Sequence, residues 1–312
     1  MNSIDHQYIQ LVNNITNNGY NVDNTRMLPM QFIRADNITT SFPVVKHKKL
    51  FVKGVWEELL FFLKGETDVR KLQDKGVHIW DANADVDYKH KHNKNLSEFD
   101  LGPIYGYQWR RFNVSYIDLQ YRSEIDYSLQ DVENNLTDQL QVIVNSLKNK
   151  SLSRRLFMSA WNPCQMDKMV LPPCHVSYHF IPYLKNSDSS SYTVDLMVYQ
   201  RSADVMLGLP FNIASASFML MIICKYCKVN AGNVCICIGN AHIYNSHFKS
   251  FDKVKEAFDN FVDANNVTVD ANNVTVEIDG DISGSFNDFL NTVTYKMLNY
   301  NVKNKIHFDL IV

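Results

Sequence analysis

Several segments of the chain carry apolar residues at the three- and four-residue spacing of amphipathic helices. Gly19 closes the first of these segments and Gly65 the second, as expected for helices that end at a glycine. A further apolar run follows the turn GLP at 208–210. The spacing predicts helices over residues 4–18, 54–64, 129–147 and 211–225.

Other segments alternate apolar and polar residues, which is typical of strands with one buried face. Val194, Leu196 and Val198 share one face of such a segment. Residues 81–100 are polar, and we expect a solvated loop there. Because no linker divides the chain, residues 1–312 are predicted to form a single α+β domain. The predicted strands are 155–161, 175–184, 193–200, 233–238 and 306–312.

Composition and charge narrow the class of protein. The 312 residues are 46% hydrophobic and 21% charged, which suits a globular chain. A formal charge of −2 argues against nucleic-acid binding through bulk positive charge. The longest apolar stretch, 214–224, falls short of the roughly 20 residues of a membrane span, and the N-terminus shows no secretory signal. We therefore expect a soluble, cytoplasmic protein with reduced cysteines.

One short repeat interrupts the chain near its C-terminal end. The seven residues VDANNVT at 262–268 recur at 269–275. Two copies are too few for a solenoid, so we interpret 262–275 as a small tandem duplication in a tolerant surface region.

The histidines and cysteines form no convincing metal motif. His90 and His92 lie among lysines and asparagines in the polar segment. The Cys pair at 224–227 ends an apolar helix and the pair at 235–237 lies in an apolar strand, without the turns of a zinc knuckle. No metal is predicted, and the chain contains neither a P-loop nor a dinucleotide glycine motif.

Glu58 occupies an unusual position among the apolar residues of the predicted helix 54–64. Burial disfavours a charged carboxylate and raises its pKa, which suits proton transfer near neutral pH. The alternative is a glutamate that bends out to solvent or pairs with a Lys or Arg.

Cys174 follows two prolines, which fix the direction of the chain just before a predicted strand. Such a cysteine can act as a nucleophile if a cation lowers its pKa, or it can be an inert buried residue. Arg201 could supply the cation or bind an anion. The pair Arg154–Arg155 is a second candidate anion site, with a solvated basic pair as the alternative.

Polar residues also follow the predicted strand 193–200. Ser202 and Asp204 precede the turn at 208–210, and Asn212 comes directly after it. The Asp204 and Asn212 side chains could hydrogen-bond the edge of a heterocycle, although Asn212 could merely begin the next helix.

Taken together and in order, six motifs resemble the thymidylate synthase family. The resemblance runs from about residue 5 to 250, with a weaker similarity in the terminal segment. The motifs are DLGPIYGYQWR at 100–110, WNP at 161–163, LPPCH at 171–175, QRSAD at 200–204, GLPFNIA at 208–214 and AHIY at 241–244.

This resemblance implies a fold, an activity and a partner. The implied fold is a mixed β-sheet flanked by helices, with the sheets of two subunits packed back to back in a homodimer that shares its active sites. The implied reaction methylates deoxyuridylate (dUMP) at C5 to give dTMP. It uses 5,10-methylenetetrahydrofolate as carbon donor and reductant, leaves dihydrofolate, and requires neither a metal, a membrane nor a nucleic acid.

The resemblance also assigns catalytic roles. Cys174 would add to C6 of the pyrimidine, and Arg201 would steady its thiolate and contact the phosphate. Glu58 would organise proton transfer to O4, and Tyr105 lies where the C5 proton leaves. Asp204 would contact both substrate and folate.

Further residues match the family's binding positions. Arg154 and Arg155 would reach across the dimer to the neighbouring phosphate, and Asn212 would read N3–H and O4 of uracil. The implied substrate set is Arg26, Arg154, Arg155, His175, Gln200, Arg201, Ser202, Asp204, Asn212, His242 and Tyr244. The implied folate set is Ile79, Trp80, Leu171, Asp204, Leu207, Gly208, Phe211 and Ile311.

The chain also departs from the family pattern. The phosphate loop near 21–30 is shortened and Arg26 could replace its arginine; His179 replaces a usual Gln and Asn240 a usual Asp. Ile311 stands where a small residue usually closes on folate. Two alternatives follow: a dUMP 5-hydroxymethylase, in which water quenches the methylene, and a non-catalytic nucleotide-binding relative.

Overall fold

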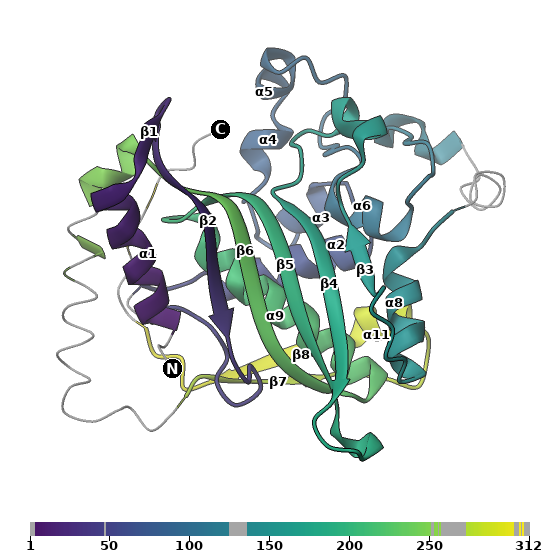
Figure 1. The fold of residues 1–312 in the computed structure, drawn as a ribbon. Helices are drawn as coiled ribbons and strands as arrows, with labels where there is room; N and C mark the ends of the chain where they lie inside the picture. Colours follow the sequence, from purple (N-terminus) through teal and green to yellow (C-terminus); the bar gives the residue numbers. More distant parts are fainter. Residues whose placement is uncertain are drawn as a thin grey trace.

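The computed structural model describes residues 4–46, 48–124, 136–250, 253, 254, 256, 273–302, 306 and 308. Its centre is a six-stranded sheet in the order β1-β2-β6-β5-β4-β3 (Figure 1). β5 and β6 run parallel and the other neighbouring pairs run antiparallel, so the sheet is mixed. The strands are β1 Tyr20–Val22, β2 Thr25–Ala35, β3 Phe157–Ser159, β4 His175–Leu184, β5 Tyr192–Asp204 and β6 Asn230–Tyr244.

Helices cover one face of this sheet. The longest, α9 (Gly208–Cys227), contacts β5, β6 and α2 (Val52–Leu63). Figure 1 shows α9 and α2 behind the sheet, with α1 (Ile4–Asn18) beside β2. α8 (Gln139–Lys148) contacts α9 and β3. The prediction of an α+β fold with a mixed sheet flanked by helices is therefore confirmed.

The core lies between the sheet and these helices. Leu196 and Val198 of β5 and Ile236 of β6 are buried on the face toward α9. Trp56 of α2 packs edge-on against Phe218 of α9, with ring centroids 5.2 Å apart. Burial of each such side chain contributes about 1.5–3 kcal/mol, so this layer rigidly supports the strand ends that carry the site.

The polar segment 81–100 is not a plain loop, contrary to the prediction. It contains two short helices, α4 (Asp81–Ala84) and α5 (Val86–Lys91). The Asp85 side chain caps α5 by accepting a hydrogen bond from the Tyr88 backbone N–H. Local capping thus organises a stretch that lacks apolar periodicity.

Several smaller elements were also absent from the prediction. β7 (Thr275–Asp279) and β8 (Thr294–Leu298) form a separate two-stranded sheet, and α11 (Phe286–Thr292) lies between them in the chain. Ser285 and Asp288 form a capping box at the start of α11. The remaining short helices are α3 Arg70–Gln73, α6 Tyr105–Arg110, and the 3-10 turns Leu119–Glu124, Pro163–Lys168, Ser189–Ser191 and Asn245–Ser250.

The central elements extend beyond their predicted bounds. β5 continues to Asp204 because it pairs with β6 as far as His242, so Arg201 to Asp204 belong to the strand and not to a turn after it. α9 begins at Gly208, with Pro210 in its first turn, where a missing N–H costs no helical hydrogen bond.

Other predicted elements are shorter or fall on residues that are not described. β3 keeps only three residues of 155–161, and α8 begins at Gln139, because Thr137 instead bridges to Phe112. Of the predicted strand 306–312, only Ile306 and Phe308 are described, and neither lies in a strand. The rest of that segment lies outside the described residues. Most of the duplication 262–275 also lies outside them, although Val274 is buried and Thr275 begins β7.

α9 is longer than the apolar stretch expected from the sequence. Its 20 residues are sufficient in length and hydropathy to cross a membrane, but 72% of its most apolar window is buried inside the fold. The helix therefore forms the core of this molecule, and the cysteines Cys224 and Cys227 are buried at its end.

Candidate active site

Most of the predicted site residues meet where three strands of the central sheet end. Cys174 directly precedes β4. In the parallel pair β5–β6, Ser202 lies beside Asn240 and Asp204 beside His242. Three helices on the covered face of the sheet supply further groups: α2 carries Glu58, α6 carries Tyr105 and α9 carries Asn212.

Cys174 is half-buried and contacts two polar groups. Its Sγ lies 3.8 Å from Nη2 of Arg201, and its backbone N–H donates to the Tyr105 hydroxyl at 2.9 Å. Burial raises the pKa of the Cys174 thiol, while Arg201 and Tyr105 lower it. The net shift is upward, so the guanidinium acts in the predicted direction but does not outweigh the loss of solvent.

Arg201 is held rigidly beside this thiol. Its Nε and Nη2 donate to the carbonyls of Pro173 and Pro172, each at 2.9 Å. The guanidinium carbon lies 5.9 Å from the centre of the Trp161 ring. The two prolines therefore fix the charge next to Cys174 as well as the direction of the chain.

Glu58 projects from α2 toward the same region. The Trp80 indole N–H donates to its Oε1 at 2.7 Å. Desolvation raises the pKa of Glu58 to about 7, against the smaller opposing effect of this hydrogen bond. The position of Glu58 on an apolar face predicted this rise, and the carboxyl is bound to an indole and not to a Lys or Arg.

Tyr105, at the start of α6, packs against the rings of Trp80 and His175. Its ring packs 6.2 Å from Trp80 and 5.5 Å from His175, between centroids. Burial raises the pKa of its phenol, and Cys174 and Glu58 raise it further. Tyr105 therefore stays protonated at neutral pH and can donate a hydrogen bond.

An amide and an imidazole lie next to the thiol. Gln200 is 2% exposed and donates from Nε2 to Oδ1 of Asn212 at 2.8 Å. Its Oε1 is buried and has no hydrogen-bond partner among the described residues. Burial lowers the pKa of His175 to about 4, although a hydrogen bond with the Asn212 side chain opposes this, so the ring is neutral at physiological pH.

The end of β6 carries a second polar group. His242 Nδ1 lies 3.2 Å from Oδ1 of Asn240 and 3.5 Å from Oγ of Ser202. The His242 ring packs at right angles to Tyr244, with centroids 5.1 Å apart. Burial lowers the pKa of His242, against the opposing charge of Asp204.

Asp204 ends β5 with one carboxylate oxygen fixed. Its Oδ1 accepts hydrogen bonds from the backbone N–H of Met206 at 3.0 Å and of Leu207 at 3.2 Å. These bonds orient the carboxylate at the point where β5 turns into α9.

Two of the predicted folate residues hydrogen-bond to the groups described above. Trp80 is held by Glu58, and Leu207 by Asp204. A Cβ at Gly208 would lie 3.7 Å from Asn212 Oδ1, an ordinary contact, so space alone does not require glycine there. The partly buried members that pack on the core are Ile79, Leu171, Leu207 and Phe211; Ile311 lies outside the described residues.

The Arg26 side chain is held beside the end of α1. The predicted shortened loop is a tight hairpin, in which Val22 of β1 pairs with Thr25 of β2. Arg26 pairs with Ile243, and its Nε donates to the Gly19 carbonyl at 3.1 Å. Because neighbouring residues of a strand point to opposite faces, Arg26 lies on the face opposite His242, as Arg201 does, so only its hydrogen bond to Gly19 directs it elsewhere.

Arg154 and Arg155 are also remote from Cys174 of the same chain. Both are exposed, and the Arg154 carbonyl lies 3.3 Å from Nε2 of His179. His179 lies five residues along the chain from Cys174, which corresponds to about 16 Å of strand. The pair therefore does not join the site of its own chain.

Three further polar residues lie near the site, and no sequence pattern had marked them. The Tyr178 hydroxyl contacts His175 Nδ1, and His247 Nδ1 lies 3.6 Å from Asp204 Oδ1. Lys48 donates to the Met206 carbonyl, and burial lowers its pKa to about 8. These residues are distant in sequence or out of phase with the strand, so only the fold places them here.

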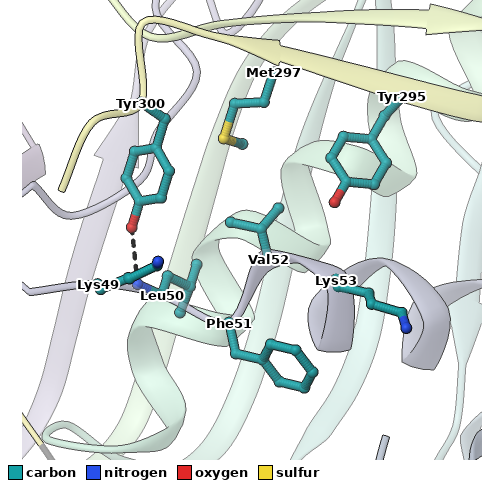
Figure 2. Close-up of a pocket in the computed structure, with 8 residues that line it drawn as sticks. All are labelled: Lys49, Leu50, Phe51, Val52, Lys53, Tyr295, Met297 and Tyr300. Carbon is teal, nitrogen blue, oxygen red and sulfur yellow. Dashed lines mark hydrogen bonds between the residues drawn. The ribbon is translucent and has the colours of Figure 1, made fainter. Parts of the chain in front are cut away.

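A pocket of about 640 Å³ opens at the start of α2, away from Cys174. Figure 2 shows Lys49 and Lys53 around an apolar floor, and the Tyr300 hydroxyl accepting from the Leu50 N–H at 2.8 Å. None of the residues predicted for the site lines it. In the described parts of the chain, no three His, Cys, Asp or Glu side chains gather as a metal site would require.

A thiol beside a guanidinium, with a carboxyl of raised pKa nearby, is the arrangement of an enzyme that uses nucleophilic catalysis. The chain belongs to the thymidylate synthase family, because the family model described as thymidylate synthase matches residues 6–312.

Curated relatives agree with this family. The chain is 40% identical over 255 residues to a bifunctional dihydrofolate reductase-thymidylate synthase of Paramecium tetraurelia, covering 80% of this chain and 52% of that protein. It is 40% identical over 218 residues to the protein so named in Zea mays, covering 70% and 39%. The corresponding Leishmania major protein is 38% identical over 255 residues, covering 79% and 46%. The chain thus spans about half the length of these relatives, or less.

Proposed function

We propose that the protein converts dUMP to dTMP with 5,10-methylenetetrahydrofolate, leaving dihydrofolate. The observation that carries this proposal is the position of the Cys174 thiol, 3.8 Å from the Arg201 guanidinium and beside the Gln200–Asn212 amide pair. A nucleophile, a fixed positive charge and a base-reading amide are what addition to a pyrimidine nucleotide requires.

Cys174 is the proposed nucleophile, which bonds to C6 of the pyrimidine. Its pKa is raised by burial in the structure, so the thiolate must form when the ring arrives. Arg201 favours that thiolate electrostatically, and its charge is fixed by the carbonyls of Pro172 and Pro173. Such preorganised charge needs no rearrangement at the moment of reaction.

Asn212 is the proposed reader of the base. Its amide N–H groups can donate to O4 of uracil and its Oδ1 can accept from N3–H. In the structure Oδ1 accepts from Gln200 and the side chain also hydrogen-bonds His175, so one of these contacts gives way when N3–H binds. The neutral His175 beside it adds a donor without adding charge. Glu58, with a pKa of about 7, can hold or release a proton near O4 at physiological pH.

The residues present also suit a folate. The apolar side chains of Trp80, Leu207 and Phe211 would pack on its ring system, and the oriented Asp204 carboxylate would hydrogen-bond the ring's N–H groups. When bound, the folate supplies the one-carbon unit and the hydride. Gln200 Oε1 is buried and has no partner among the residues that the structure describes, which is consistent with a site completed by ligands.

We further propose that two copies of the chain pair through the face of the sheet opposite α9. Phe32, Phe157, Met197 and Tyr199 are 70, 54, 41 and 45% exposed on this face, which no helix covers in the described parts of the chain. Exposed apolar surface of this kind favours association. Pairing there would let Arg154 and Arg155 serve the neighbouring subunit's phosphate.

Incubation with dUMP and methylenetetrahydrofolate, with both products identified, tests the activity. We expect dTMP together with dihydrofolate. Hydroxymethyl-dUMP together with tetrahydrofolate would replace this proposal with the hydroxymethylase, and failure to release the C5 hydrogen would leave a nucleotide-binding protein.

A further inference from the structure

A β-bulge re-aims the start of β4. His175 pairs with Gln200 of β5, but Ser177 pairs with Tyr199, so two steps along β4 oppose one step along β5. Val176 is the extra residue. In a regular strand, residues three apart point to opposite faces, but one inserted residue brings His175 and Tyr178 to the same face.

Tyr178 uses this placement to contact His175. Its hydroxyl oxygen lies 3.2 Å from Nδ1 of His175. The side chain is 4% exposed and packs edge-on against Trp109, with centroids 5.1 Å apart. Because the ring is held by packing, the hydroxyl stays within reach of the imidazole.

The protonation of both partners decides the direction of this hydrogen bond. Burial, together with the charge of Glu58, raises the pKa of the Tyr178 phenol, so it keeps its proton. A neutral imidazole has one N–H and one acceptor nitrogen. If the phenol donates to Nδ1, the imidazole proton resides on Nε2, and a neutral His175 can donate from there.

A second contact agrees with this assignment. The hydrogen bond between His175 and the Asn212 side chain raises the pKa of His175, the direction expected when the ring donates to the amide oxygen. Nδ1 lies against Tyr178. The ring nitrogen that remains for Asn212 is then Nε2.

We propose that Tyr178 is a positioning residue that fixes His175 as the Nε2–H tautomer, oriented toward Asn212 and the base that Asn212 reads. Tyr178 contacts neither substrate nor folate in this assignment. It acts by keeping a neutral donor in place where O4 of the pyrimidine gains electron density. The kinetic part of this inference rests on the proposed function.

The tautomer itself is measurable without any activity. In ¹⁵N-histidine-labelled protein, the ring nitrogen shifts of His175, assigned with a His175→Asn variant, report which nitrogen carries the proton. We expect Nε2–H in the unmodified protein and a mixture of tautomers in Tyr178→Phe. An Nδ1–H tautomer in the unmodified protein would overturn the proposal, whether or not the protein turns over dUMP.

Kinetics then separate positioning from loss of stability. Tyr178→Phe should lower kcat by about 5- to 10-fold, the loss of one buried hydrogen bond, with KM for dUMP little changed. In the His175→Asn background the same substitution should have no further effect on kcat. An undiminished effect in that background would contradict action through His175.

Tyr192→Phe is the matched control. Tyr192 is a buried tyrosine of β5 whose hydroxyl donates to the Ser151 carbonyl at 2.5 Å. Its loss should lower the melting temperature about as much as Tyr178→Phe does, and should leave kcat and the His175 tautomer unchanged. A change of the tautomer in this control would show that the signal reports general loosening of the fold.

Discussion

At the scale of single residues, the site combines one fixed positive charge with titratable side chains whose charged forms are disfavoured by burial. Burial raises the pKa of both Cys174 and Glu58 and lowers that of His175. Arg201 is the oriented positive group beside the thiol. Burial therefore favours the neutral form of each of these three side chains.

Cys174→Ser should abolish turnover, because a serine hydroxyl is a far weaker nucleophile than a thiolate. We expect kcat to fall by at least about 10³-fold with the fold intact. The covalent adduct with a 5-fluorinated dUMP, detected by mass spectrometry, should also be lost. Substantial residual rate would contradict the nucleophile assignment.

Glu58 should make stability depend on pH between about 4.5 and 7. Its folded-state pKa of about 7 exceeds the ordinary value of 4.5, so between these pH values the unfolded chain loses this proton while the native state keeps it, and stability falls as pH rises. Relative to Glu58→Gln, the wild-type melting temperature should fall as pH rises from about 4.5 to about 7 and then level off. Parallel curves across this range would show that the carboxyl is not desolvated.

Asn212→Asp should shift base preference toward deoxycytidylate, since a carboxylate can accept from the exocyclic amine of cytosine but cannot donate to O4 of uracil. The ratio of kcat/KM for the two nucleotides measures the shift, which one lost or gained hydrogen bond places at about 10-fold or more. Unchanged selectivity would remove Asn212 from its role as reader.

At the scale of elements, strand phase decides which side chains meet. The sequence motifs located Cys174, Arg201 and Asn212, because their residue types and order carry the resemblance. Alternation from His175, however, assigns Tyr178 to the opposite face, and only the bulge at Val176 brings the two together. Likewise, pairing with β6 carries β5 through Asp204, where the pattern predicted a turn.

Deletion of Val176 should straighten the start of β4 without changing its phase. His175 and Tyr178 would then be two residues apart in a regular strand and would still point to the same face, with Gln200 and Val198 as their partners. We therefore expect Cys174 to keep forming the covalent adduct, with a lower kcat because the local twist of the bulge is lost. Loss of the adduct while circular dichroism still reports a folded chain would show that the bulge sets more than the strand phase.

At the scale of the whole molecule, the uncovered face of the sheet and the position of Arg154 and Arg155 both support the proposed pairing of two copies. Arg154 lies beside His179, about 16 Å of strand from Cys174 of the same chain. A homodimer would explain both the exposed apolar side chains and the exposed arginines.

The double variant Phe32→Asp with Met197→Asp should weaken self-association, because it introduces charge on the proposed contact face. Light scattering after gel filtration should show the molar mass falling toward 36.1 kDa, with activity lost in parallel. Val142→Asp is the control: Val142 is 56% exposed on α8, away from that face. An unchanged mass in the double variant would place the contact elsewhere.

The sequence by itself determined the family and the α+β class and supplied the candidates for the reacting groups, because those depend on residue types in a fixed order. Apolar spacing also located α2 and its acid, Glu58. Tertiary structure alone decided the distances: that burial outweighs Arg201 at the thiol, that Arg26 turns to Gly19, and that Tyr178 reaches His175. These outcomes depend on solvent exclusion and strand register, which arise only when segments distant in the chain pack together.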